Sequence, residues 1–141
     1  MLQNIMSRNL QQLENRLIWQ VRLNFSDSKE PELTTENAHK VIDKWVKNNK
    51  ICLFMKGTPV SPQCGYSNFV VELLKKYGIT EYKSINVLKD NIVREQVKIY
   101  SKWPTYPQLF IDGELVGGCD ILHEMHKDQS LETLLQEKGL I

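Results

Sequence analysis

The sequence lacks the compositional extremes that mark several classes of protein. Its 141 residues include only three cysteines, and its formal net charge is +1. Three cysteines are too few for a disulfide scaffold, so a reducing compartment is the simpler inference. The near-neutral charge gives no reason to expect nucleic acid as a partner. No run approaches the ~20 apolar residues that span a bilayer, which argues against membrane insertion.

A more specific absence is that of a second cysteine at position 67. Cys64 ends the run KGTPVSPQC that begins at Lys56, and Gly, Tyr and Ser67 follow it. A redox dithiol of the C-x-x-C type would place its second thiol where Ser67 stands. A single thiol indicates a site that holds something, as a mixed disulfide or a metal ligand. It is less typical of a site that shuttles electrons within one motif.

Residues 1–33 differ in pattern from the rest of the chain. Apolar residues recur there at helical spacing, while arginines and few acids occupy the other face. This pattern is typical of a mitochondrial targeting segment, followed by a polar linker over 26–32. The alternatives are an extra helix packed on the domain and a flexible tail. We therefore expect an N-terminal extension over 1–33, a domain over 34–141, and the mitochondrial matrix as location, with the cytoplasm as alternative.

Within 34–141 the apolar residues alternate between helical and strand spacing. Strands are expected over 51–55, 81–87, 108–111 and 114–117. A helical crossover between the first two predicts a parallel pair, and Asp-Gly between the last two predicts an antiparallel hairpin. The fold class is therefore α/β, a four-stranded mixed sheet with helices on both faces. A helix should begin just after Cys64, and the other expected N-caps are Thr34 or Thr35, Asp90, Asp120 and Ser130.

Cys64 lies where an activated thiol is expected. It follows the strand 51–55 at its carboxyl end, where open α/β sheets place their ligands, and it directly precedes a helix. The free N–H groups of a first helical turn stabilise a thiolate. Lys56 either adds a second stabilising charge or is an ordinary solvated lysine. Cys52, inside the buried strand, is interpreted as a core residue.

Three segments together resemble the monothiol glutaredoxins. They are FMKGTPVSPQCGYS over 54–67, WPTYPQLF over 103–110 and GGCDI over 117–121. The resemblance covers about residues 35–141 and departs from the family's usual CGFS at Tyr66, which adds a hydroxyl to the aromatic ring. It implies a thioredoxin fold, binding of glutathione, and a bridging 2Fe–2S cluster shared by two subunits.

The resemblance also assigns roles to individual residues. Cys64 would be both the catalytic residue and the cluster ligand, and glutathione would supply the thiolates that two chains lack. Lys56 and Lys98 would contact the glycine carboxylate of glutathione, with Arg94 as a weaker candidate. The first turn at Cys119 and Asp120 would hold the γ-glutamyl end. The residues implied to contact glutathione are Lys56, Lys98, Thr105, Tyr106, Pro107, Cys119 and Asp120, with Pro107 as the family's cis-proline.

The remaining cysteine of the motifs, one tryptophan and the histidines have separate interpretations. Cys119 could donate only its backbone, or it could act as a resolving thiol for Cys64. Trp103 is expected to pack at a helix end. The three histidines, His39, His123 and His126, are interpreted as surface residues of helices, because they do not cluster with cysteines.

Two hypotheses about function follow. The first is a carrier that receives a 2Fe–2S cluster from a scaffold protein and passes it to recipient apoproteins, with BolA-like proteins as further partners implied by the resemblance. The second is a glutathione-dependent thiol-disulfide oxidoreductase that acts through Cys64 alone. The missing thiol at Ser67 favours the carrier, since it removes the intramolecular step of dithiol exchange. A third hypothesis, an inert adapter with a thioredoxin fold, would not explain the presence of Lys56, Thr105 and Asp120.

Overall fold

A computed structural model describes residues 31–141 of the chain. The expectations for residues 1–30, the targeting segment among them, lie outside the described residues. The stretch from Leu33 to Ile141 forms one compact unit. In the part of the chain that is described, no helix is long and apolar enough to cross a membrane.

The apolar run Ile51–Met55 forms the central strand β1, and all five of its residues are buried. It pairs in parallel with β2 (Lys83–Asn86) and antiparallel with β3 (Gln108–Ile111). The hairpin partner of β3 is β4 (Glu114–Gly117), so the sheet order is β2-β1-β3-β4. The four-stranded mixed sheet is therefore confirmed, although β2 is shorter than the predicted strand over 81–87.

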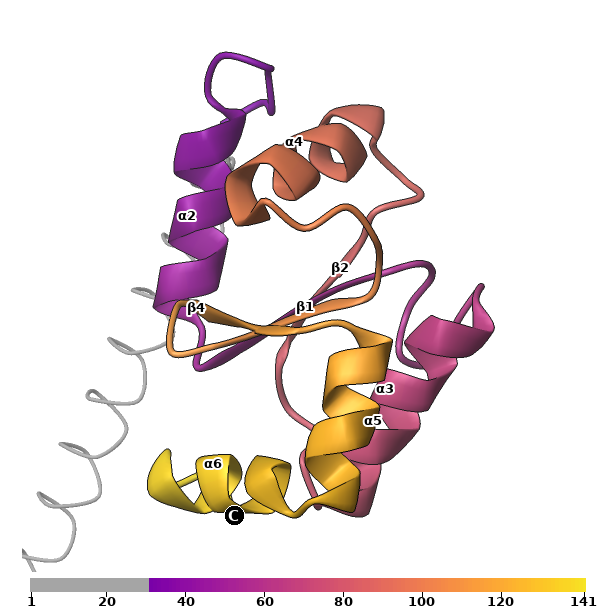
Figure 1. The fold of residues 1–141 in the computed structure, drawn as a ribbon. Helices are drawn as coiled ribbons and strands as arrows, with labels where there is room; N and C mark the ends of the chain where they lie inside the picture. The colour runs from indigo at the N-terminus through magenta and orange to yellow at the C-terminus, as the bar shows by residue number, and fades with distance from the viewer. Residues whose placement is uncertain (1–30) are drawn as a thin grey trace, which may run out of the picture. The chain divides into compact units, whose positions relative to one another are not determined.

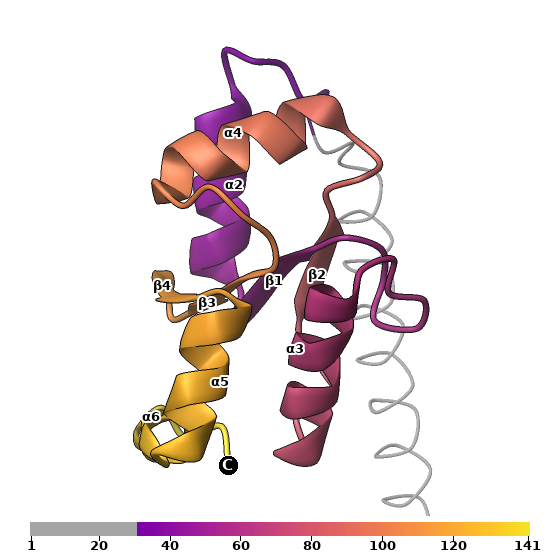
Figure 2. The same ribbon diagram turned by 45° about the vertical axis from the view of Figure 1, so that its right-hand side comes forward.

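Helices cover both faces of this sheet (Figures 1 and 2). On one face lie α2 (Ala38–Asn48) and α4 (Asn91–Ser101). The opposite face carries α3 (Gly65–Lys76), α5 (Cys119–Lys127) and α6 (Ser130–Glu137). Because successive strand residues point to opposite faces, β1 contributes to two separate hydrophobic clusters.

The residues of β1 show this division of the core. Cys52 and Phe54 pack with α2 and α4, whereas Leu53 and Met55 pack with the helices of the other face. The Cys52 side chain is 0% exposed, which confirms it as a core residue. Burial raises the pKa of its thiol to about 12. Cys52 is therefore a neutral thiol that has no access to the surface.

Of the four helix N-caps predicted besides Cys64, only Asp90 is correct. Asp90 caps α4, and its Oδ1 accepts hydrogen bonds from two N–H groups of the first turn, at 2.8 and 3.3 Å. The prediction of Thr34 or Thr35 as the cap of α2 is wrong. Thr34 and Asn37 instead exchange hydrogen bonds between side chain and backbone, and these close a turn that precedes the helix.

The two caps predicted near the C-terminus are wrong as well. The N-cap of α5 is Gly118, which has no side chain to cap the helix, and Asp120 lies inside the first turn. The N-cap of α6 is Gln129, whose φ of 66° is left-handed, so Ser130 is the first residue of the helix. Backbone conformation rather than a capping side chain sets both helix starts.

Candidate active site around Cys64

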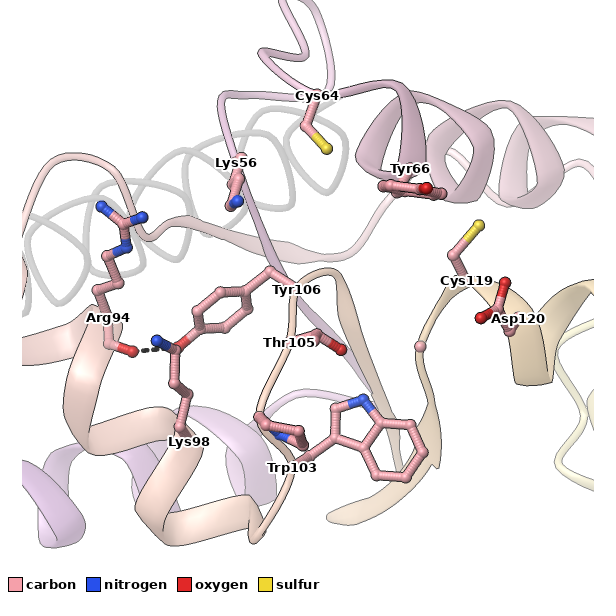
Figure 3. Close-up of a pocket in the computed structure, with 12 residues that line it drawn as sticks. Lys56, Cys64, Tyr66, Arg94, Lys98, Trp103, Thr105, Tyr106, Cys119 and Asp120 are labelled. Carbon is pink, nitrogen blue, oxygen red and sulfur yellow. Dashed lines mark hydrogen bonds between the residues drawn. The ribbon is translucent and has the colours of Figure 1, made fainter.

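A cleft of about 500 Å³ opens beyond the carboxyl end of β1 (Figure 3). Its walls come from the segment after β1, from α4, from the loop before β3 and from the start of α5. The structure therefore brings together segments that are far apart in the sequence. The predicted site residues that line the cleft are Lys56, Cys64, Lys98, Thr105, Tyr106, Cys119 and Asp120, and Arg94 lines it too.

Cys64 is the N-cap of α3, so the predicted helix start directly after it is confirmed. Its side chain is partly exposed, and Figure 3 shows the sulfur pointing into the cleft. The backbone N–H of Ser67, followed by that of Tyr66 and the charge of Lys56, holds the pKa of the Cys64 thiol below its ordinary value. These effects outweigh the opposing effect of burial. Lys56 is thus a stabiliser of the thiolate rather than a lysine without influence on it.

Ser67 contributes more than the absence of a second thiol. It is 0% exposed, and its Oγ accepts a hydrogen bond from the backbone N–H of Lys56 at 3.1 Å. Its hydroxyl also helps to lower the pKa of Cys64. Ser67 therefore links the end of β1 to the thiol. This bond was not predictable from the sequence, because it joins residues eleven positions apart.

The loop between Lys56 and Cys64 is held by backbone contacts. Gln63 donates its N–H to the carbonyl of Lys56 at 2.9 Å, and Gly57 donates its N–H to Oδ1 of Asn86 at 3.0 Å. Gly57 has a φ of +92°, and a Cβ there would lie 2.6 Å from backbone atoms of the same loop. Only glycine fits such a position. The loop thus holds Lys56 and Cys64 in a defined relation to each other.

The opposite wall is the segment that precedes β3. The Tyr106–Pro107 peptide bond is cis, as the resemblance implied, although Pro107 does not itself line the cleft. The buried Tyr106 donates its hydroxyl to the carbonyl of Arg94 at 2.7 Å, which ties this wall to α4. Trp103 also lines the cleft, so it does more than pack at a helix end.

The start of α5 forms the remaining wall. Cys119 is a free, partly exposed cysteine that lines the cleft. Burial, followed by the charges of Asp120 and Cys64, raises the pKa of the Cys119 thiol. The pKa is therefore lowered for the Cys64 thiol and raised for the Cys119 thiol. Because the thiolate is the nucleophilic and metal-binding form of cysteine, Cys64 is the better suited of the two to such chemistry.

The histidines lie away from these groups. His39 and His123 are exposed, as predicted, and each contacts an aromatic ring edge-on. His126 is only partly exposed on α5, and its Nδ1 lies 2.7 Å from the hydroxyl of Tyr77. Among residues 31–141, no three His, Cys, Asp or Glu side chains gather as a metal site would require.

Comparison with known proteins gives consistent matches. The glutaredoxin family profile matches residues 51–116. The chain is 50% identical to the mitochondrial glutaredoxin-related protein 5 of Danio rerio over 103 residues, which are 73% of this chain and 66% of that protein. It is 53% identical to a probable monothiol glutaredoxin 2 of Rickettsia conorii over 97 residues, 69% of this chain and 90% of that protein.

Solved structures agree with these matches. The crystal structure of a buckwheat glutaredoxin–glutathione complex has a TM-score of 0.65 and 27% identity, and the alignment covers 76% of this chain and 94% of that one. The four-stranded sheet with helices on both faces is the thioredoxin fold, as predicted. On its fold and its relatives, the chain belongs to the monothiol glutaredoxins.

Proposed function

We propose that the cleft binds glutathione with the glutathione sulfur beside Cys64. The basic side chains of Lys56, Arg94 and Lys98 lie at one end of the cleft, and Cys119 and Asp120 lie at the other (Figure 3). Glutathione carries its glycine carboxylate at one end and an α-carboxylate with an ammonium group at the other. Cations match the first end, and a helix N-terminus with a carboxylate matches the second.

The residues between these ends suit the middle of the tripeptide. Thr105 lines the cleft between the two charged ends, and the backbone of Tyr106 pairs with the ligand as a neighbouring strand would. Pro107 directly follows that backbone and would lie beside the ligand. The buckwheat relative was solved as a complex with glutathione, which supports the same ligand here.

The chain acts, in this proposal, as a carrier of a 2Fe–2S cluster that bridges two subunits. Such a cluster takes four thiolates. Cys52 is buried in the core and the pKa of Cys119 is raised, so Cys64 is the cysteine of each chain best suited to ligate iron. Two chains and two glutathione molecules complete the set. Because the glutathione thiolates exchange, the cluster can leave, as a carrier requires.

The observation that carries this proposal is the single activated thiol of Cys64 with a buried serine, Ser67, at the position of the resolving cysteine. The partners that follow are a scaffold protein that donates the cluster, recipient apoproteins and BolA-like proteins. The Danio relative is named as mitochondrial, which supports the mitochondrial matrix as the location.

The lowered pKa of Cys64 also favours a second function, that of a glutathione-dependent oxidoreductase. The Cys64 thiolate would attack the glutathione sulfur of a glutathionylated protein, and the protein thiolate would leave and take a proton from water. A second glutathione thiolate would then attack the mixed disulfide. Glutathione disulfide would leave, and the Cys64 thiolate would be restored.

Reconstitution of the full chain separates the two functions. The chain is incubated with iron, sulfide and reduced glutathione, and its visible spectrum and mass are recorded. A carrier gives a coloured dimer that loses its colour in the variant Cys64→Ser and keeps it in the matched control Cys119→Ser. A colourless monomer that rapidly reduces glutathionylated substrate would instead establish the oxidoreductase.

The location has its own test. A fusion of residues 1–33 to a fluorescent reporter is expected to enter mitochondria and to lose that import when the arginines of the segment are replaced by glutamine. A reporter that stays in the cytoplasm would contradict the targeting proposal and leave the chemistry of the cleft unaffected.

A further inference from the structure

Gln108 is a buried polar residue whose bonds reach the wall of the cleft. It is the first residue of β3, lies opposite Phe54 of β1 and is 0% exposed. Its Nε2 donates hydrogen bonds to the carbonyl of Trp103 at 3.0 Å and to that of Thr105 at 3.1 Å. Both carbonyls belong to the loop that lines the cleft, while the Gln108 side chain does not line it.

We propose that Gln108 is a positioning residue that holds the Trp103–Thr105 loop in the shape that binds glutathione. The rest of β3 is apolar, and an apolar side chain of similar size would suit the same site in the core. The Oε1 of Gln108 has no hydrogen-bond partner within the described residues. Burial of this amide oxygen costs free energy, which only the two bonds donated by Nε2 offset. The amide therefore contributes to the structure through these two bonds to the loop.

The Trp103–Thr105 loop in turn supports the start of α5. A Cβ built on Gly118 would lie 3.2 Å from Nε1 of Trp103, so the indole ring packs directly against this glycine. Gly118 is followed by Cys119 and Asp120, the residues proposed to hold the γ-glutamyl end. Through one amide, Gln108 thus braces both the middle of the cleft and one of its ends. This inference rests on the proposed binding of glutathione.

The test uses the variant Gln108→Met, which keeps the shape of the side chain and removes both donated bonds. Calorimetry on the full chain measures the affinity for reduced glutathione, which is expected to fall about tenfold. The pH profile for alkylation of Cys64 by iodoacetamide, measured in a Cys119→Ser background, is expected to stay unchanged. Gln108 is not among the groups that shift the pKa of Cys64, so the two readouts separate positioning from general damage.

A matched control is Phe110→Leu, a change on the same strand that weakens core packing but makes no bond to the loop. It is expected to lower stability and leave the glutathione affinity unchanged. If the unchanged chain fails to bind glutathione, the proposed function and this inference both fall. If the unchanged chain binds and Gln108→Met binds equally well, or if the alkylation profile shifts as well, this inference alone is overturned.

A second measurement needs no variant. The side-chain amide hydrogens of Gln108 in the isotope-labelled full chain are expected to exchange slowly with water, because both are buried and hydrogen-bonded. Rapid exchange of these hydrogens would overturn the proposal even if Gln108→Met did not fold.

Discussion

At the scale of single residues, Ser67 affects the chemistry open to Cys64 in two ways. Ser67 offers no second thiol, so a mixed disulfide at Cys64 cannot be resolved by this position. Its hydroxyl meanwhile accepts the N–H of Lys56 and stabilises the Cys64 thiolate. One residue thus both closes the dithiol route and adds, through its hydroxyl, the smallest of the effects that lower the pKa of Cys64.

Replacement of Ser67 by alanine is expected to raise the pKa of Cys64. The change removes the side-chain hydrogen bond to the thiolate, while the larger effect of the Ser67 backbone N–H persists. It also leaves the partly buried N–H of Lys56 without its acceptor, which costs about 1 kcal/mol of stability. The pH dependence of Cys64 alkylation, in a Cys119→Ser background, and a urea unfolding curve measure the two effects.

Ser61→Ala is the control for this prediction. Ser61 is exposed on the loop before Cys64 and is not among the groups that shift the pKa of that thiol. Its replacement should leave the alkylation profile where it is. An unchanged profile in Ser67→Ala as well would show that the hydroxyl has no part in activating Cys64.

At the scale of elements, α4 illustrates how a single cap supports the cleft. Asp90 accepts bonds from the first turn of α4, and Arg94 and Lys98 follow on the same helix. We expect Asp90→Ala to destabilise the protein by about 1 kcal/mol, because two N–H groups lose their acceptor. Urea unfolding measures this loss. Asp90→Asn keeps an acceptor oxygen and should retain most of the stability, so equal losses in both variants would contradict the role of the cap.

The same helices show how far elements can be predicted from sequence. The hairpin around Asp112-Gly113 has the predicted bounds, because the turn residues fix its register. The start of α3 after Cys64 was also predictable from the pattern of apolar residues. The caps at Asp120 and Ser130 were not, since ranking residues by capping side chain cannot detect a glycine N-cap or a left-handed residue before a helix.

The candidate site was likewise predictable from the sequence only in part. Cys64 and most of the residues proposed to bind glutathione could be named from segments that resemble a family, and the structure places them around one cleft. The bonds that support them, from Ser67, Asn86 and Gln108, join backbone and side chains that only the folded chain brings together. The sequence alone does not reveal which group the side chain of a strand glutamine or a helix serine will contact.

At the scale of the whole molecule, the place of each cysteine in the fold determines how readily its thiol ionises. Cys52 lies inside the sheet, where burial raises its pKa to about 12, and Cys64 lies at the cleft with its pKa lowered. Tyr100 adds a second acid that is only partly buried, since desolvation and its hydrogen bond with Asp43 raise its pKa to about 12. Folding therefore changes how tightly the chain holds several protons.

This difference predicts a loss of stability at alkaline pH. Above the ordinary thiol pKa of about 9, the unfolded chain releases the Cys52 proton and the folded chain keeps it until about pH 12, so stability falls with rising pH in that window. The thiolate of Cys64 acts in the opposite sense, but its stabilising effect is already complete above the unfolded pKa. From about pH 8 to about pH 10.5, Cys52 should contribute a loss on the order of 2 kcal/mol.

Urea unfolding of the unchanged chain and of Cys52→Ala, with reductant present, isolates this contribution. Alanine leaves a small cavity that lowers stability at every pH, but it removes the proton that the fold retains. The difference in stability between the two pH values should therefore be smaller in Cys52→Ala by about 2 kcal/mol, with the remainder due to Tyr100 and other titrating groups. Equal pH dependence in both proteins would mean that the Cys52 thiol ionises in the folded chain as readily as in the unfolded one, and that the central strand is open to water.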